Sequence, residues 1–318
     1  MFYSIVIPVY NGKETLGETV KSIVRQDFTD YELILVDDGS TDGTGELCDQ
    51  FEKQYDFIKV IHQKNAYLGA ARNRGLDEAS GKYVYFLDAD DLLCEGILQA
   101  AFFFDGADVI ASNRFYAYDC RVGKERVKKG DFDGGMPAKR INSRLAAFSP
   151  YAGQSFYRIA FLREEGIRFE EERINSEDRV WTVRLLHRSR KTAVLETPCY
   201  RYTEHRAGSL MNCMSADNIL GSLQALEALL FDLPSFDYEE GALRKRICNE
   251  FLSFCALAAL VRDEALSKEL MAYVREHLYI LKDKDCSARL FLWARHVIGL
   301  KNLLKLCNAV FLHYTTDK

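Results

Sequence analysis

Apolar residues recur in short runs through the first 113 residues, and between these runs they recur at helical spacing. The runs are rich in β-branched and aromatic residues, which is typical of buried strands. Short connections between alternating strands and helices favour parallel pairing with right-handed crossovers. The pattern predicts a doubly wound, mainly parallel α/β sheet flanked by helices. The expected strands are 3–9, 31–36, 58–62, 83–87 and 107–113, and the expected helices are about 15–26, 45–55 and 70–79.

The pattern changes twice in the second half of the chain. Residues 115–131 alternate between polar and apolar positions around a glycine turn at Gly123, which predicts a hairpin. From about residue 216 onward, leucine and phenylalanine recur at helical spacing. We therefore expect an α/β domain over 1–212 and a helical C-terminal region over 213–318.

Polar loops follow three of the predicted parallel strands, at 8–11, 37–42 and 88–91. The carboxyl ends of parallel strands meet at one edge of a sheet, which is where open α/β sheets bind ligands. The last loop carries Asp88, Asp90 and Asp91. Carboxylates this dense suit a hard divalent ion that holds a phosphate group, although Asp91 could instead cap a helix beginning near Leu92.

Composition and the absence of common motifs exclude several classes of protein. A net charge of -5 argues against a nucleic-acid partner. The chain has neither G-x-G-x-x-G nor G-x-x-x-x-G-K-[ST], which disfavours dinucleotide-binding and P-loop proteins. Nine cysteines without a C-x-x-C pair indicate a reducing, cytoplasmic setting. No uncharged apolar run reaches about 18 residues, so we expect no spanning helix.

Four segments resemble the family 2 glycosyltransferases with the GT-A fold. These segments are 4–11 (SIVIPVYN), 36–44 (VDDGSTDGT), 69–75 (GAARNRG) and 86–91 (FLDADD). The resemblance implies an inverting transferase with a nucleotide-diphospho-sugar donor and a divalent metal, Mn2+ or Mg2+. It further implies a nucleotide-binding half at 1–115 and an acceptor and catalytic half at 116–212. UDP is the first expectation for the nucleotide, with GDP and dTDP open.

The resemblance also implies roles for individual residues. In this family pattern, Asp38 and the backbone near Tyr10 hold the base and ribose, Asp88 binds ribose or a metal-bound water, and Asp90 coordinates the metal. Arg206 or His205, in the segment YRYTEHRAGSL, neutralises phosphate charge, and His205 is a candidate metal ligand. The implied nucleotide-sugar residues are Pro8, Val9, Tyr10, Asp38, Arg72, Asn73, Asp88 and Arg206, and the implied metal ligands are Asp90 and His205.

Several of these polar residues have a structural alternative. Asp37 fits a ligand or a carboxylate that fixes its loop equally well, and Asp42 is better read as a loop or helix cap. Arg72 and Asn73 could instead lie on a solvated helix face. Residues outside the family pattern are expected at the surface or in packing roles, among them His62 and His187.

The segment 173–181 (RINSEDRVW) resembles the family's Glu-Asp motif at the start of a helix. An inverting transfer needs one carboxylate to take the acceptor hydroxyl's proton. We assign this general base to Asp178, with Glu177 as the rival. Capping by Ser176 and the helix dipole favour carboxylates here even without catalysis.

The acceptor is the least defined part of this hypothesis. A growing glycan or a lipid-linked acceptor of bacterial surface polysaccharide synthesis fits the cytoplasmic setting. Residues 287–314 are basic and apolar without an acidic residue, which fits peripheral contact with the inner face of a membrane, or packing within the protein or a homodimer. The rival functions are a nucleotidyltransferase on a related fold and a non-catalytic sugar-nucleotide-binding module.

Overall fold

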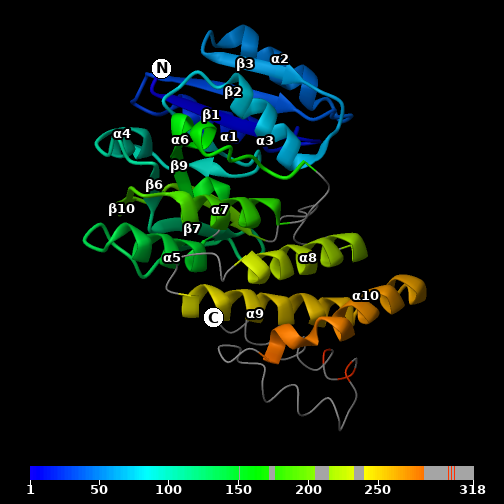
Figure 1. Cartoon of the computed structure of the whole chain (residues 1–318). Coiled ribbons are helices and arrows are strands. Elements are labelled where there is room, and N and C mark those ends of the chain that lie inside the picture. The colour runs from blue at the N-terminus through cyan, green and yellow to red at the C-terminus, as the bar shows by residue number, and fades with distance from the viewer. Residues whose placement is uncertain are drawn as a thin grey trace. The chain divides into compact units, whose positions relative to one another are not determined.

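The computed structural model describes residues 1–149, 151–171, 176–204, 215–232 and 240–282, together with residues 300, 302 and 304 (Figure 1). The chain forms two compact units. The first unit comprises Met1–Arg173 and Glu177–Asn212, and the second comprises Ile174–Ser176 and Cys213–Lys318.

A seven-stranded sheet is the centre of the first unit, with the strand order β10-β6-β9-β4-β1-β2-β3. All neighbouring strands run parallel except β9, which is antiparallel to both β4 and β6. The predicted mainly parallel α/β sheet is confirmed. Its strands are β1 (Tyr3–Val9), β2 (Tyr31–Asp37), β3 (Ile58–His62), β4 (Tyr83–Phe86), β6 (Val109–Ser112), β9 (Ser155–Arg158) and β10 (Thr192–Leu195).

Helices flank this sheet (Figure 1). In α1 (Leu16–Val24) the apolar residues Leu16, Val20 and Ile23 are fully buried, as their helical spacing predicts. Each such side chain contributes about 1.5–3 kcal/mol of burial free energy. The other helical elements are α2 (Thr44–Gln54), α3 (Tyr67–Glu78), α4 (Ile97–Phe102), α5 (Ala138–Phe148), η1 (Ala152–Gln154), α6 (Ile159–Glu164) and α7 (Glu177–Arg188).

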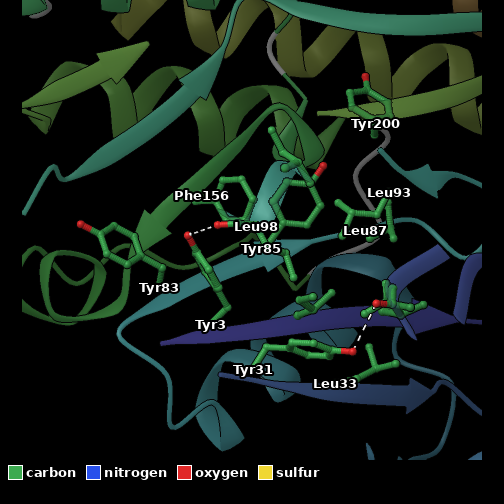
Figure 2. Close-up of a cluster of buried hydrophobic side chains, with 14 of the residues drawn as sticks. Tyr3, Tyr31, Leu33, Tyr83, Tyr85, Leu87, Leu93, Leu98, Phe156 and Tyr200 are labelled. Carbon is green, nitrogen blue, oxygen red and sulfur yellow. Dashed lines mark hydrogen bonds between the residues drawn. The ribbon is translucent and has the colours of Figure 1, made fainter. Parts of the chain in front are cut away.

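Aromatic side chains form much of the hydrophobic core between the strands of this sheet and the flanking helices α1 and α4 (Figure 2). Tyr3 packs against Phe156 with ring centroids 5.1 Å apart, and Phe156 packs against Tyr85 at 4.6 Å. A buried hydroxyl needs a hydrogen-bond partner, and the Tyr3 hydroxyl donates to the Leu98 carbonyl at 2.9 Å. The Tyr31 hydroxyl likewise donates to Ile23 at 3.2 Å. These bonds tie the strands to the flanking helical segments.

A second, four-stranded sheet has the order β5-β11-β7-β8. It contains the predicted hairpin, and its strands are β5 (Leu92–Leu93), β7 (Arg114–Asp119), β8 (Lys124–Lys129) and β11 (Tyr200–Glu204). The expectation of a helix near Leu92 with Asp91 as its N-cap is wrong. Leu92 begins β5, and α4 starts at Ile97 after Gly96 in a left-handed conformation. Asp91 Oδ1 instead accepts from the Thr203 amide of β11 at 3.2 Å.

The second unit is helical in the residues described, as predicted for the C-terminal region. Its elements are α8 (Ala216–Asp232), α9 (Glu240–Ala258), α10 (Glu264–Glu276) and η3 (Leu278–Lys282). Leu223, Leu226, Phe251 and Cys255 are fully buried within it. Among the described helices, none combines the length and apolarity needed to cross a membrane. Most of 287–314, the predicted membrane or dimer segment, lies outside the described residues.

Candidate active site

The loops after β1, β2 and β4 lie at one edge of the large sheet, because these strands are parallel neighbours in register. The Asp38 amide donates to the Val9 carbonyl at 2.9 Å, and the Leu87 amide donates to Val6 at 3.0 Å. Pro8 and Val9 are buried, so only their backbone could face a ligand, whereas Tyr10 is 53% exposed. The loops that the sequence predicts to bind a nucleotide therefore lie together at one edge of the sheet.

Asp38 is buried at this edge and is held by the loop that follows β3. Its Oδ1 accepts from Gln63 Nε2 at 2.7 Å and from the Ala66 amide at 2.9 Å. An ionised carboxylate has about four acceptor positions on two oxygens, and both of these bonds use the same oxygen. The geometry thus leaves acceptor capacity for a ligand hydroxyl or base, and a nucleotide contact by Asp38 stays a prediction.

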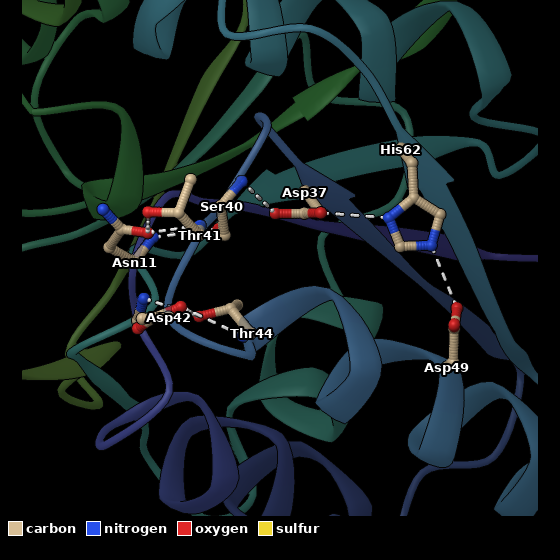
Figure 3. Close-up of polar contacts among 9 residues, drawn as sticks. Asn11, Asp37, Ser40, Thr41, Asp42, Thr44, Asp49 and His62 are labelled. Carbon is tan, nitrogen blue, oxygen red and sulfur yellow. Dashed lines mark hydrogen bonds and ion pairs between the residues drawn. The ribbon is translucent and has the colours of Figure 1, made fainter.

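Asp37 and Asp42 shape the loop between β2 and α2 (Figure 3). Asp37 Oδ1 accepts from the Ser40 amide at 3.0 Å, and its Oδ2 lies 3.0 Å from His62 Nδ1. Asp42 accepts from the Thr44 amide at 3.0 Å and from the Lys13 amide at 3.2 Å. Both carboxylates therefore have the contacts of the structural alternative that the sequence left open.

A cavity of about 350 Å³ opens beside this loop. It lies between the turn after β1 and the loop after β2, which the Asn11 side chain joins by accepting from the Thr41 amide at 2.8 Å. The lining residues are Asn11, Gly12, Lys13, Glu14, Thr15 and Asp42.

Arg72 of α3 is the most heavily engaged charged residue of the site. Its side chain is almost completely buried, with 2% of the residue exposed, which rules out the solvated helix face. Nη1 donates to Glu177 Oε1 at 2.6 Å, and Nη2 donates to Asp88 Oδ1 at 2.9 Å. Burial alone would lower the pKa of Arg72, but the nearby carboxylates of Asp88, Glu177 and Asp178 outweigh it and raise the pKa. Arg72 thus links the acidic loop after β4 to the start of α7.

Asn73 is buried next to Arg72 and binds the chain rather than facing the edge. Its amide nitrogen donates to the Phe169 carbonyl at 2.9 Å and to Glu171 Oε1 at 2.9 Å, and its oxygen accepts from the Phe169 amide at 3.0 Å. These contacts position the segment before α7. A direct nucleotide contact by Asn73 stays a prediction.

The three carboxylates of the acidic cluster differ in burial. The Asp88 side chain is 48% exposed, Asp90 is half-buried, and Asp91 is buried against β11. In the part of the chain that the structure describes, no group of three or more His, Cys, Asp or Glu residues is arranged to hold a metal ion. Protein sites for Mg2+ often provide only one or two carboxylates, with phosphate and water oxygens completing the shell. Asp88 and Asp90 fit that requirement, whereas His205 and Arg206 lie outside the described residues.

Asp178 is the second residue of α7 and is half-buried. Its Oδ1 accepts from the Arg179 amide at 2.8 Å. Burial, and next the neighbouring Glu177 carboxylate, raise the pKa of Asp178 to about 7. A carboxylate whose pKa lies near neutrality can take up a proton efficiently at that pH. The electrostatics therefore suit the predicted general base.

Sequence reasoning missed two contacts at this site. Glu177 was considered only as a rival base, yet it is the buried partner of Arg72. His62 was expected at the surface or in packing; it is half exposed, but both of its ring nitrogens contact carboxylates. The signal for His62 lies in strand register, because it ends β3 directly beside Asp37 at the end of β2.

Comparison with known proteins places these features in context. Glycosyl transferase family 2 matches residues 4–165. A cholesterol galactosyltransferase of Borreliella burgdorferi is 30% identical over 242 residues, which cover 71% of this chain and 67% of that protein. The poly(ribitol-phosphate) beta-N-acetylglucosaminyltransferase TarS of Staphylococcus aureus (strain Mu50) is 28% identical over 80% of this chain, but this match spans only 44% of TarS.

Solved structures share the fold at low sequence identity. A crystal structure of S. aureus TarS 1-349 in complex with UDP-GlcNAc superposes with a TM-score of 0.68 and 21% identity, over 96% of this chain and 90% of that one. The mannosyltransferase PcManGT from Pyrobaculum calidifontis, in complex with GDP-Man and Mn2+, superposes with a TM-score of 0.57 and 15% identity, over 95% of this chain and 84% of that one.

Proposed function

This chain belongs to glycosyl transferase family 2 and is an enzyme that transfers sugars, and we propose that it is an inverting transferase with a UDP-sugar donor. The single observation that carries the catalytic part is the bridge formed by Arg72. One guanidinium contacts Asp88, from the acidic loop, and Glu177, which immediately precedes Asp178. The guanidinium thereby links a donor-side carboxylate to the first residue of α7, the helix that carries the candidate base.

The donor would bind at the carboxyl edge of the sheet. The backbone of Pro8 and Val9, the exposed Tyr10 ring and the buried Asp38 would hold the uridine. Arg206 would act on the phosphates. The UDP-GlcNAc complex of TarS supports UDP as the nucleotide, and TarS shares the fold.

A divalent metal fits the acidic loop, where Asp90, with Asp88 beside it and His205 as a further candidate, would hold Mn2+ or Mg2+. Such an ion stabilises the negative charge that develops on a departing nucleoside diphosphate. The Mn2+ complex of PcManGT supports this assignment as a relative of the same fold. Arg72 would keep Asp88 oriented whether or not the ion is bound.

Asp178 would act as the general base. Its carboxylate would accept the proton of the acceptor hydroxyl while that oxygen attacks the anomeric carbon from the face opposite the diphosphate, which inverts the configuration. Glu177 would not compete for the proton, because its Oε1 is bound by the permanently charged Arg72.

The acceptor would be a glycan or a lipid-linked glycan of a bacterial surface polymer. The names of two relatives, a poly(ribitol-phosphate) beta-N-acetylglucosaminyltransferase and a cholesterol galactosyltransferase, support a polymer or a lipid as the acceptor class. We propose a cytoplasmic location, in which residues 287–314 would contact the membrane peripherally, pack within the protein or form a homodimer contact.

Donor hydrolysis and donor binding test this proposal together. Purified protein is screened against UDP-, GDP- and dTDP-sugars with and without Mn2+ by thermal shift, since a bound donor raises the midpoint as RT ln(1 + [L]/Kd). Release of the nucleotide diphosphate is then compared between the native chain and Asp178→Asn. Asp77→Asn is the matched control, because Asp77 pairs with Arg168 at an exposed position. A non-catalytic binding module would shift its midpoint with donor but release no diphosphate in any of the three proteins.

A further inference from the structure

His62 is held between two carboxylates at the donor edge (Figure 3). Its Nδ1 lies 3.0 Å from Asp37 Oδ2, and its Nε2 lies 2.9 Å from Asp49 Oδ1 on α2. The next residue, Gln63, donates to Asp38 at 2.7 Å. Two consecutive residues at the end of β3, His62 and Gln63, therefore hold the two consecutive carboxylates at the end of β2.

The two contacts of His62 require a particular protonation state. A neutral imidazole has one N–H donor and one acceptor nitrogen, whereas an imidazolium donates from both nitrogens. Carboxylate oxygens only accept when ionised. Both distances are hydrogen-bond distances, so the charged form satisfies both contacts and the neutral form leaves one nitrogen facing an oxygen without a proton between them.

The charges around His62 favour its protonated form. Hydrogen bonds to Asp37 and then to Asp49 raise the pKa of His62, against the opposing effect of burial. These two carboxylates are the charged groups that act on the ring from β2 and α2. The buried Cys48 thiol lies near the same carboxylates, and burial, followed by their charge, raises its pKa to about 12, so it adds no charge here.

Close packing transmits the state of this contact to the loop. The first turn of α2 lies directly over it, because a Cβ added at Gly45 would be 3.0 Å from Asp37 Oδ2 and 3.5 Å from the His62 ring. Asp37 also accepts from the Ser40 amide. Loss of the His62 contact would therefore remove one of the contacts that hold Asp37 and, through it, the loop 37–44 that carries Asp38.

We propose that His62 is a positioning residue for the donor: as an imidazolium it fastens Asp37 to Asp49 and so holds the loop that presents Asp38 to the nucleotide. The inference rests on the proposed function. It requires donor affinity to fall as the pH rises through the titration of His62. The turnover number depends on Asp178, which lies on a different segment, and so should not change with the state of His62.

Two variants separate this role from simple packing. His62→Gln is uncharged at every pH, so it should weaken binding of UDP with Mn2+ at about pH 6.5 by about 3–10-fold, the value of one hydrogen bond, and should show a flatter pH dependence. Asp49→Asn offers an amide donor to Nε2, which satisfies neutral His62 with Nδ1–H donating to Asp37. This variant should bind UDP as tightly as the native chain does at about pH 6.5, and it should keep that affinity as the pH rises.

Isothermal titration calorimetry between about pH 6 and pH 8.5 measures these affinities. His277→Gln serves as the control, because His277 belongs to the second unit and contacts Glu227 and Tyr273 there. The pH profile of its UDP affinity should match that of the native chain, so a change seen in His62→Gln would be specific to His62. The intrinsic titration of UDP is the same for all these proteins and cancels when their affinities are compared. Equal UDP affinities of His62→Gln and the native chain at every pH would overturn the proposal.

Proton NMR titration of the six histidines gives a readout that needs no ligand. The His62 resonance, assigned from its loss in His62→Gln, should titrate above the ordinary range and move down in Asp49→Asn. If no nucleotide binds to any variant, the proposed function fails. The NMR titration would still test whether His62 is an imidazolium held by Asp37 and Asp49. A His62 resonance that titrates normally in both proteins would overturn it even if donor binding is found.

Discussion

Arg72 Nη1 lies 2.6 Å from Glu177 Oε1, so a residue of α3 fixes the first residue of α7 across 105 positions of sequence. Both side chains are largely buried, and the other guanidinium nitrogen reaches Asp88. The ring of Phe169 lies 5.2 Å from the guanidinium carbon. The Arg72 guanidinium thus lies between two carboxylates and links α3 to the acidic loop and to α7.

Removing this cation should be costly for the fold. Arg72→Met leaves the buried Glu177 carboxylate without its partner, so we expect the free energy of unfolding to fall by about 3–5 kcal/mol. Adding Glu177→Met should recover part of the loss, because the unpaired buried charge is then gone. Urea unfolding followed by circular dichroism measures both changes.

The control for this measurement is Arg168→Met. Arg168 pairs with Asp77, and both side chains are nearly half exposed, so the loss should stay within about 1 kcal/mol. Equal losses in Arg72→Met and Arg168→Met would mean that the Arg72 bridge contributes no more than a surface ion pair.

The raised pKa of Asp178 predicts how activity depends on pH. A general base must be ionised, so kcat should rise with pH up to about 7 and level off above it. Asp178→Asn should lower kcat by about 100-fold or more and remove this ascending limb. Initial rates of diphosphate release at saturating donor and acceptor measure it, and retention of the limb in Asp178→Asn would assign it to another group.

The raised pKa of Asp178 also predicts that its ionised carboxylate lowers the stability of the folded protein. Folded Asp178 binds its proton more tightly than the unfolded chain does, so its contribution to stability is present below about pH 4 and is lost as the pH rises to about 7. At about pH 8 the folded state holds an unfavourable negative charge on the half-buried Asp178. Asp178→Asn should then be more stable than the native chain at about pH 8 and no more stable at about pH 4, as thermal unfolding at both values would show.

Much of the fold followed from sequence because it depends on local pattern. The strands that became β1 to β4 are apolar runs with clear boundaries, and the hairpin of β7 and β8 carries its own glycine turn. The antiparallel insertion of β9 between β4 and β6 was not predicted, because it pairs residues far apart in the chain. Asp91 was misread for the same reason: its partner, Thr203, lies 112 positions away.

The candidate site, like the fold, could be predicted from sequence only in part. Its residues could be located from motifs, but whether Arg72 and Asn73 would face a ligand or the protein depended on partners near residue 170 and at Glu177. A carboxylate next to a strand end looks identical in sequence whether it binds a ligand, as proposed for Asp38, or its own loop, as Asp37 does. Only the register of β2 with β3 shows that His62 is placed to hold Asp37.

The acidic loop predicts a metal dependence that binding measurements can isolate. Asp90→Asn should weaken UDP binding in the presence of Mn2+ by about tenfold or more, because an amide is a poorer ligand for a hard cation. Without metal, the variant and the native chain should bind UDP equally weakly. Isothermal titration calorimetry in both conditions gives the comparison, with Asp77→Asn as the control. A metal-independent loss in Asp90→Asn would assign this residue to the nucleotide instead.

The close approach of α3 to the segment before α7 predicts a stringent requirement for glycine at position 69. A Cβ added to Gly69 would overlap the Glu170 carbonyl oxygen, which is backbone and cannot turn aside. Gly69→Ala should therefore push α3 from this segment and disturb Arg72 one turn further on, with a loss of about 1–3 kcal/mol and reduced activity. Gly17→Ala is the matched control, since no neighbouring atom lies within 4 Å of the added Cβ. As a helical position in α1, Gly17 should gain about 0.5–1 kcal/mol from alanine. The two substitutions should thus move the urea midpoint in opposite directions, and a Gly69→Ala protein as stable and active as the native chain would show that α3 does not position Arg72 through this contact.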